Sequence, residues 1–273
     1  MRKQIITLII IAVFVIMAVC AENAKSQQTK VSSTGSGGQT TSVASSSQKI
    51  KEMHPKYGRS LEFSEKDEAE YNKILEALNK NEWNYDKLTA KQNEFLKKVG
   101  GLDETKSSLW NTIGDGCSWY CGGGPSDITA SSYLKSNHAT INYVPKNIHD
   151  FSLKTAWVEG VEGQGIGEYV TYHFSSTAAR VTHVIIANGC VVSERLYRAN
   201  SRVKKLKMYV DGKPFAILNL KDVRKEQIFK FDPIGRMHNN DWTMKFEILE
   251  VYPGDKYEDT VITEIYFDGI DVH

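Results

Sequence analysis

The chain has 273 residues and a formal net charge of +1, and charged residues make up 25% of it. This length suggests one or two domains, and the balanced charge argues against a nucleic-acid partner or a generally basic surface. Apolar residues are concentrated after about residue 110, in numbers that suffice for one sizeable core.

Residues 1–20 have the pattern of a secretory signal peptide. A short basic start, Met1 to Lys3, precedes an almost wholly apolar run from Ile5 to Val19. That run is shorter than the roughly 20 residues that a membrane-spanning helix needs. We therefore expect an exported protein.

Two cleavage sites compete at the end of this segment. Met17-Ala-Val-Cys20 resembles a bacterial lipobox, although Met17 and Val19 differ from its usual residues, and cleavage there leaves Cys20 as the lipidated first residue. Cleavage after Ala21 by ordinary signal peptidase is the alternative. We favour lipidation, because a polar tether follows, and so expect a lipid anchor in the membrane of the bacterial cell envelope. A soluble secreted or periplasmic protein is the alternative location.

Residues 21–49 form that tether. They are mostly Ser, Thr, Gln and Gly, with almost no apolar side chain. Such a segment cannot bury enough surface to offset its ordering entropy, so we expect it to be disordered.

Residues 50–112 predict a short helical segment. Ser64 and Asp67 have the spacing of a helix cap, and Thr89 with Gln92 forms a second capping box. Narrow apolar stripes follow each cap. We favour a helical hairpin packed on the next domain over a partner-docking helix pair.

A glycine-rich segment from Gly114 to Pro125 contains Cys117 and Cys121 around a Trp-Tyr pair. In an exported protein this spacing predicts a Cys117–Cys121 disulfide that presents Trp119 and Tyr120 for stacking on a sugar ring. Cys190 is then left over, and we expect it to be buried. The rival interpretation is a zinc site, which needs a further ligand such as His138 or His149.

Residues 113–273 have the spacing of turn residues that is typical of an all-β domain. Alternating apolar residues and turn signals predict several short strands without helices between them, which is typical of a sandwich or barrel. The expected strands are Ile128–Leu134, Tyr169–Phe174, Val181–Ala187, Leu206–Val210, Phe215–Leu220, Trp242–Ile248 and Val261–Phe267. Asp211-Gly212 is the expected hairpin turn.

Two stretches of this domain resemble a known family. Asp150-x4-Thr155-x-Trp157 leads into a strand, and Tyr252-Pro-Gly-Asp-Lys-Tyr257 precedes the last strand. With Gly165-Ile-Gly-Glu168, they resemble discoidin-like (factor V/VIII type C) domains, in particular the translocation or glycan-binding domain found beside bacterial NAD glycohydrolases. The resemblance implies a galactose-binding-like jelly-roll sandwich and a binding role. It does not imply NAD hydrolysis, which belongs to a different domain in those proteins.

The same resemblance implies a structural calcium ion, with Asp150, Thr155 and Glu264 at the matching positions. Carboxylate, hydroxyl and carbonyl oxygens are the ligands that calcium prefers. Phe151 and Leu153 depart from the family's small or polar residues in this loop. The alternative is local pairing, with Thr155 in a turn that Asp150 caps and Glu264 beside a basic residue.

Arg198, Asn200 and Arg202 precede a strand and are candidates to hydrogen-bond a ligand, although an ordinary surface loop has the same composition. The segment Gly163–Glu168 superficially suggests a phosphate loop, but a strand pattern follows it, so it predicts a tight turn.

No nucleophile motif or placeable carboxylate pair is present, so we expect no enzyme activity. The predicted function is non-catalytic binding of a carbohydrate or another cell-surface ligand by an exported domain. The alternative is a structural or protein–protein module of the cell envelope without affinity for glycans.

Overall fold

The computed structural model describes residues 50–103, 105–138, 140–235 and 240–272. The signal peptide, the lipidation site at Cys20 and the tether lie outside the described residues, and they stay predictions. Within the described ranges, none of the helices has the length and apolar character that crossing a membrane requires.

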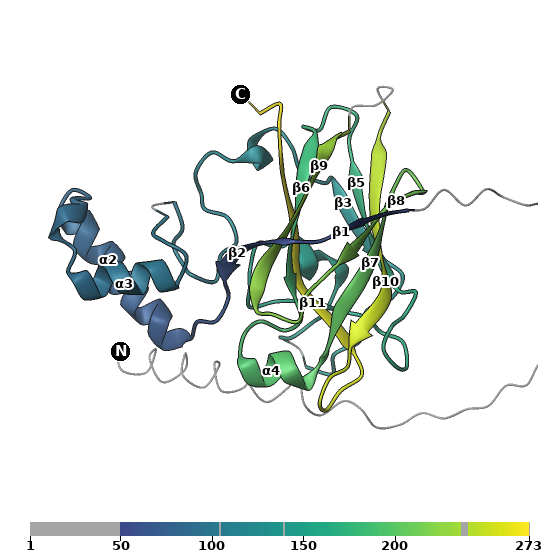
Figure 1. Cartoon of the computed structure of the whole chain (residues 1–273), viewed down its shortest axis with the longest axis horizontal. Coiled ribbons are helices and arrows are strands. Elements are labelled where there is room, and N and C mark those ends of the chain that lie inside the picture. Colours follow the sequence, from purple (N-terminus) through teal and green to yellow (C-terminus); the bar gives the residue numbers. More distant parts are fainter. Residues whose placement is uncertain (1–49, 104, 139, 236–239, 273) are drawn as a thin grey trace, which may run out of the picture. The chain divides into compact units, whose positions relative to one another are not determined.

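Among the described residues, eleven strands form one sheet that folds into two layers (Figure 1). Eight of them lie on one continuous path, and β1, β4 and β8 pair beside it. The strands of the predicted sandwich are β3 (Asp127–Ala130), β4 (Trp157–Val158), β5 (Tyr169–Phe174), β6 (Val181–Asn188), β7 (Ser201–Val210), β8 (Lys213–Asn219), β9 (Lys225–Ile234), β10 (Trp242–Tyr252) and β11 (Thr260–Gly269). One group is ordered β2-β9-β6-β11 and the other β7-β10-β5-β3, with β8 on the free side of β7. A short parallel contact at Thr260↔Ser201 and Val261↔Arg202 joins the two groups.

The core lies between these groups. The alternating apolar residues point inward, and Trp157, Tyr172 and Phe246 are each at most 1% exposed. The predicted all-β sandwich is thereby confirmed. The Asp211-Gly212 turn is also confirmed, with φ of 46° and 71°, the left-handed backbone that such a hairpin turn requires.

Several strand predictions need correction, including the start of β7, at Ser201 instead of Leu206, and the short β4, which was not predicted. The first strand ends at Ala130 instead of Leu134, because the hydroxyl of Ser131 accepts from the backbone N–H of Tyr169 (2.9 Å) in place of a ladder bond. Strand β9 is absent from the sequence prediction, since Pro233 and alternating charges mask its pattern.

The N-terminal segment is only partly helical. Helices α2 (Glu65–Lys80) and α3 (Ala90–Lys98) carry the two predicted capping boxes, which confirms them. However, β1 (Lys51–Met53) pairs with β8 and β2 (Lys56–Ser60) pairs with β9, so residues 51–60 belong to the sandwich. The predicted boundary at residue 113 is therefore wrong for these strands. Edge strands offer unpaired backbone groups, which a polar segment can pair without any apolar pattern.

The hairpin of α2 and α3 packs on the sandwich through a second apolar cluster, here called the hairpin cluster. Its members come from the hairpin, from the linker after it and from the sandwich. They are Leu61, Phe63, Tyr71, Ile74, Leu78, Leu96, Val99, Leu109, Trp110, Leu153, Ala187 and Val191. This arrangement agrees with the packed-hairpin interpretation.

Candidate functional site

Asp150 and Thr155 lie close to Glu264, which is more than 100 residues away in sequence. Asp150 ends the 3-10 helix η4 (Pro145–His149), and the Thr155 hydroxyl donates to its carboxylate at 2.8 and 2.7 Å. Glu264 projects from the middle of β11 and is completely buried. We call residues 150–155 the cation loop.

The Glu264 carboxylate lacks a hydrogen-bond partner at both oxygens within the described part of the chain. Burial raises the pKa of Glu264 well above its usual value, and the neighbouring Asp150 acts in the same direction. The N–H groups of Phe151 and Ser152 oppose that shift, but neither reaches hydrogen-bond geometry with the carboxylate. A buried carboxylate without partners is costly, so this site fits a bound cation.

The donor set of this site indicates which cation fits. Among the described residues, no three His, Cys, Asp or Glu side chains converge in a way that suits a metal. Two carboxylates must then be completed by hydroxyl and carbonyl oxygens, which is the chemistry of calcium. Phe151 holds a φ of 62°, the left-handed backbone that glycine adopts most easily, so the loop keeps this turn despite its larger side chain.

The rival zinc site does not assemble from its candidate ligands. His149 donates through Nδ1 to the Ile265 carbonyl at 2.7 Å and packs among aromatic rings. Burial lowers the pKa of His149 to about 4. The imidazole is therefore a core group that uses one nitrogen for a backbone contact.

The prediction that Trp119 and Tyr120 form an exposed platform is wrong. Trp119 is 4% exposed and donates from its indole to the Arg180 carbonyl, and the Tyr120 hydroxyl accepts from the Phe267 N–H. The two rings pack edge to face with their centroids 5.1 Å apart. The 3-10 helix η3 (Trp119–Cys121) turns both rings toward the core, where two large aromatic side chains bury more apolar surface than at a loop tip.

Cys117 and Cys121 are exposed, and their Sγ atoms lie 3.2 Å apart, a contact distance rather than a bonded one. Cys190 is buried, as expected. The disulfide stays a prediction. We expect protein recovered from an oxidising compartment to resist alkylation at both cysteines until it is reduced, which peptide mass spectrometry measures. Cys190 in the same sample is the internal control, and alkylation of Cys117 without reduction would contradict the prediction.

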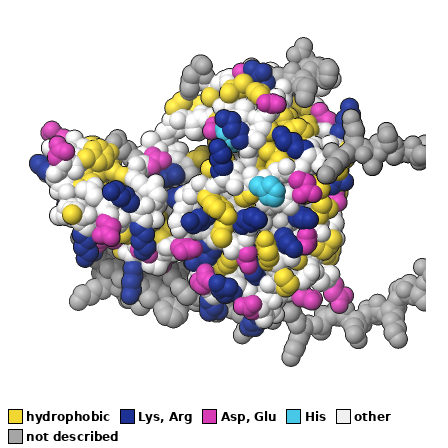
Figure 2. Space-filling model, in the orientation of Figure 1, with side chains coloured by type: hydrophobic (Ala, Val, Ile, Leu, Met, Phe, Trp, Pro, Cys, Tyr) yellow, Lys and Arg dark blue, Asp and Glu magenta, His cyan; other side chains and the backbone are white. Residues whose placement is uncertain are grey.

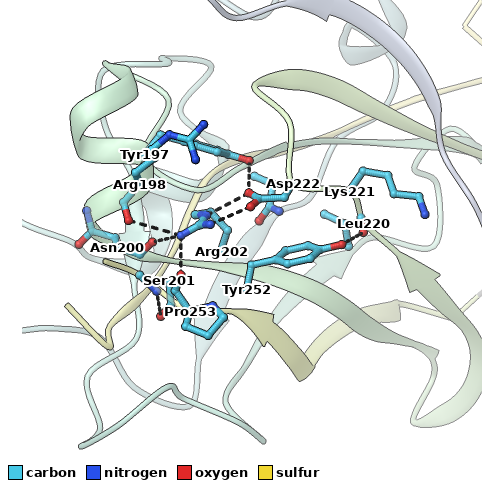
Figure 3. Close-up of polar contacts among 12 residues, drawn as sticks. Tyr197, Arg198, Asn200, Ser201, Arg202, Leu220, Lys221, Asp222, Tyr252 and Pro253 are labelled. Carbon is cyan, nitrogen blue, oxygen red and sulfur yellow. Dashed lines mark hydrogen bonds and ion pairs between the residues drawn. The ribbon is translucent and has the colours of Figure 1, made fainter. Parts of the chain in front are cut away.

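Arg202 is the centre of a buried polar cluster at one end of the sandwich (Figure 3). Its guanidinium forms a two-pronged pair with Asp222, at 2.8 and 3.1 Å, and donates to the carbonyls of Asn200 and Pro253. Tyr197, in helix α4 (Glu194–Ala199), donates its hydroxyl to Asp222 at 2.9 Å. Burial alone would raise the pKa of Asp222, but hydrogen bonds from Arg202 and Tyr197 outweigh it and lower that pKa.

This cluster corrects the predicted ligand contacts. Asn200 is 5% exposed, and its amide caps α4 by donating to the Leu196 carbonyl. The donors of Asn200 and Arg202 thus form hydrogen bonds within the protein. The reason is local: the turn out of α4 leaves carbonyl groups that need donors. Only Arg198 points to solvent, beside Glu194.

Residues 189–200, which include α4, meet the loops 220–224 and 253–259 at this end, which we call the α4 end. The loop 159–168 adjoins them through Thr260, which donates to Glu159 and to the Gln164 carbonyl. Backbone hydrogen bonds from Asp255 and Tyr257 join the loop 253–259 to Arg198 and Ala199. The pairing of Asp222 with Arg202 joins the loop 220–224 to the same end. Figure 1 shows α4 at the end of the sandwich away from the C-terminus.

Glu159 fixes the loop 159–168 and was missed by the sequence prediction. Its buried carboxylate accepts from the N–H groups of Val161 and Thr260, at 2.9 and 3.1 Å. Burial raises the pKa of Glu159 to about 7. Gly165 has a φ of 64°, and a Cβ there would lie 2.4 Å from Glu159, so this position needs glycine. The loop then enters β5 directly, which confirms the turn prediction.

The loop 159–168 also carries exposed apolar side chains, with Val161 40% and Ile166 55% exposed. On the face shown in Figure 2, acidic and basic side chains are interspersed and hydrophobic ones form small groups. A rigid loop with apolar tips beside charged groups is suited to ligand contact.

A family model described as the NAD glycohydrolase translocation F5/8 type C domain matches residues 119–268, more than half of the chain. The match includes the cation loop and all four loops of the α4 end. No curated protein matches the chain.

Solved structures of low sequence identity are also similar. The CBM32-1 and CBM32-2 domains of Clostridium perfringens ZmpB are 12% identical, with a TM-score of 0.39, over 56% of this chain and 36% of theirs. CpGH89CBM32-5 from Clostridium perfringens, in complex with GalNAc-beta-1,3-galactose, is 16% identical, with a TM-score of 0.38. The match covers 52% of this chain and 94% of that one. The arabinofuranosyltransferase AftD from Mycobacteria is 15% identical, with a TM-score of 0.39. The match covers 54% of this chain and 11% of that one. The chain thus spans about a third of the ZmpB structure's length.

Proposed function

Because the chain belongs to the NAD glycohydrolase translocation F5/8 type C domain family, we propose that it is a non-catalytic module that binds a carbohydrate through the α4 end. The family match carries this proposal. It covers the sandwich and its loops, and the family is defined by a translocation domain rather than by a hydrolase. The proposed role is therefore binding.

The structure of the α4 end supports the choice of surface. Arg202 and Asp222 join helix α4, strand β7 and two loops by charge-assisted hydrogen bonds, which makes the end rigid before any ligand arrives. Preorganised loops lose little conformational entropy on binding. Ile166 and Arg198 provide an exposed apolar side chain and an exposed donor at this end.

A solved structure with a bound glycan indicates which ligand class to test first. The CpGH89CBM32-5 structure is a complex with GalNAc-beta-1,3-galactose, so galactose-type glycans are the first to test. Sugar recognition combines apolar contact with the ring and hydrogen bonds to hydroxyl groups. Both kinds of group are present in the loops of the α4 end.

We also propose that Asp150, Thr155 and Glu264 hold a structural calcium ion. The buried, unpartnered carboxylate of Glu264 beside the Asp150 carboxylate supports this assignment. The ion would supply positive charge that balances these two carboxylates. The cation loop is not part of the α4 end, so the proposed role of the ion is to stabilise the fold and not to contact the ligand.

A glycan-array screen of the purified full chain, with calcium and with a chelator, tests the binding proposal. We expect binding to at least one glycan class, and recovered glycans of unchanged mass, since no bond is cleaved. An array without binding in either condition would contradict carbohydrate recognition and favour a protein–protein module. Shortened glycans would contradict the non-catalytic assignment.

A further inference from the structure

The cation loop contacts the helical hairpin as well as the proposed calcium ligands. Asp150 lies next to the Glu264 carboxylate, whereas Leu153, three residues on, is completely buried in the hairpin cluster. A loop this short cannot move at one of these residues without moving at the other. It is therefore shared between the cation site and the hairpin.

The backbone makes the link direct. The linker after the hairpin pairs with the cation loop as a short antiparallel ladder. The Leu153 N–H donates to the Trp110 carbonyl at 2.7 Å, and the Thr112 N–H donates to the Phe151 carbonyl at 3.0 Å. Between these bonds, Asn111 and Ser152 form a bridge. Phe151, the residue in the left-handed conformation, thus directs its N–H group toward the cation site and its carbonyl toward the linker.

Side chains extend this path to helix α2. The Glu68 carboxylate accepts from the Ser108 hydroxyl at 2.7 Å and from the Leu109 N–H at 2.8 Å, which ties the linker to the first turn of α2. Lys154 of the cation loop reaches Glu65 at 3.5 Å and lies 5.1 Å from the centre of the Trp110 ring. The hairpin therefore docks partly on the loop that would hold the ion.

We propose that calcium binding and docking of the helical hairpin are thermodynamically linked. The inference rests on the proposed calcium site. Without the ion, the buried Glu264 carboxyl group has no hydrogen-bond partner among the described residues, and the left-handed backbone of Phe151 is held only by its neighbours. The ion fixes the loop and hence the ladder with residues 110–112. Linkage is reciprocal, so a docked hairpin must strengthen calcium binding by the same factor.

Hydrogen exchange of the purified full chain, with calcium and with a chelator, tests this linkage. We expect calcium to slow exchange in peptides from residues 65–99 by at least about fivefold, the lower end of typical coupling between sites. Peptides from β7 and β10 are the internal control and should change less. The Glu264→Gln variant should show no calcium effect in either set.

Two variants test the reciprocal effect by calorimetric titration with calcium. Leu153→Ala removes the contact with the hairpin cluster and keeps the carboxylates. It should weaken calcium binding by the factor that couples calcium binding to docking of the hairpin. Lys98→Ala breaks the hairpin's ion pair with Asp67 without touching the cation loop, so it should bind calcium as the wild type does.

The outcomes separate the two proposals. Calcium binding without slower exchange in residues 65–99 would overturn the linkage and leave the calcium site standing. No calcium binding by calorimetry would overturn both. Should Leu153→Ala fail to fold, the wild-type comparison still decides the question.

Discussion

Replacing Glu264 with glutamine is expected to abolish the stabilisation by calcium and to raise the stability of the calcium-free protein. The wild type should gain about 2.7 kcal/mol at a calcium concentration 100 times the dissociation constant. For a domain of this size, that corresponds to a rise in melting temperature of roughly 5–10 °C. The amide keeps the shape of the carboxylate but removes its buried charge, so the variant should melt at the same temperature with calcium and with chelator.

The pH dependence of the calcium-free protein follows from the same carboxylate. Burial raises the folded-state pKa of Glu264 above its unfolded value. Its contribution to stability is therefore present below the unfolded pKa and is lost as pH rises toward the folded pKa. The wild type in chelator should lose stability over this range more steeply than Glu264→Gln. An unchanged wild-type melt on adding chelator would contradict the calcium site.

Replacing Arg202 with leucine is expected to destabilise the protein by about 3 kcal/mol, the lower end of the range for breaking a buried ion pair. The lower end applies because the Asp222 side chain is 33% exposed and keeps some solvation. The change leaves this carboxylate unpaired and removes donors from the carbonyls of Asn200 and Pro253. Denaturant unfolding measures the difference, with Arg198→Leu as the control at an exposed position.

Asp222 adds a pH signature to this prediction. Its folded-state pKa is lowered, so its stabilising contribution is present above the unfolded pKa and is lost as pH falls through the folded pKa. The Arg202→Leu variant should lack this loss at low pH. Equal effects of Arg202→Leu and Arg198→Leu on unfolding would contradict the structural role of Arg202.

Local patterns predicted most of this fold. Alternating apolar residues identified β5 and β10, because one side chain in two faces the core. The same pattern identified β6 and β11, although most of their side chains are buried on both faces. The caps at Ser64 and Thr89 identified both helices, since each satisfies backbone N–H groups that the helix leaves unpaired. Family motifs located Asp150 and Thr155 with Glu264.

The remaining errors concern properties that sequence spacing does not encode. Trp119 and Tyr120 lie in a polar, glycine-rich segment, and only the folded chain shows that η3 turns them into the core. Arg202 and Asn200 have the composition of a binding loop. They satisfy local carbonyl groups at the end of α4, and Arg202 is also held by Asp222 and Pro253, which are distant in sequence. Strands β1 and β2 pair through backbone groups, which leave no side-chain pattern.

Calorimetric titration of a glycan from the array screen into the wild type and an Ile166→Ala, Arg198→Ala double variant tests the central claim most directly. Arg180→Ala, at the opposite end of the sandwich beside Asp271, is the matched control. We expect the double variant to lose at least about tenfold in affinity, a loss of about 1.4 kcal/mol, and the control to bind like the wild type. Equal affinity in the double variant, or a loss in Arg180→Ala alone, would contradict carbohydrate binding at the α4 end.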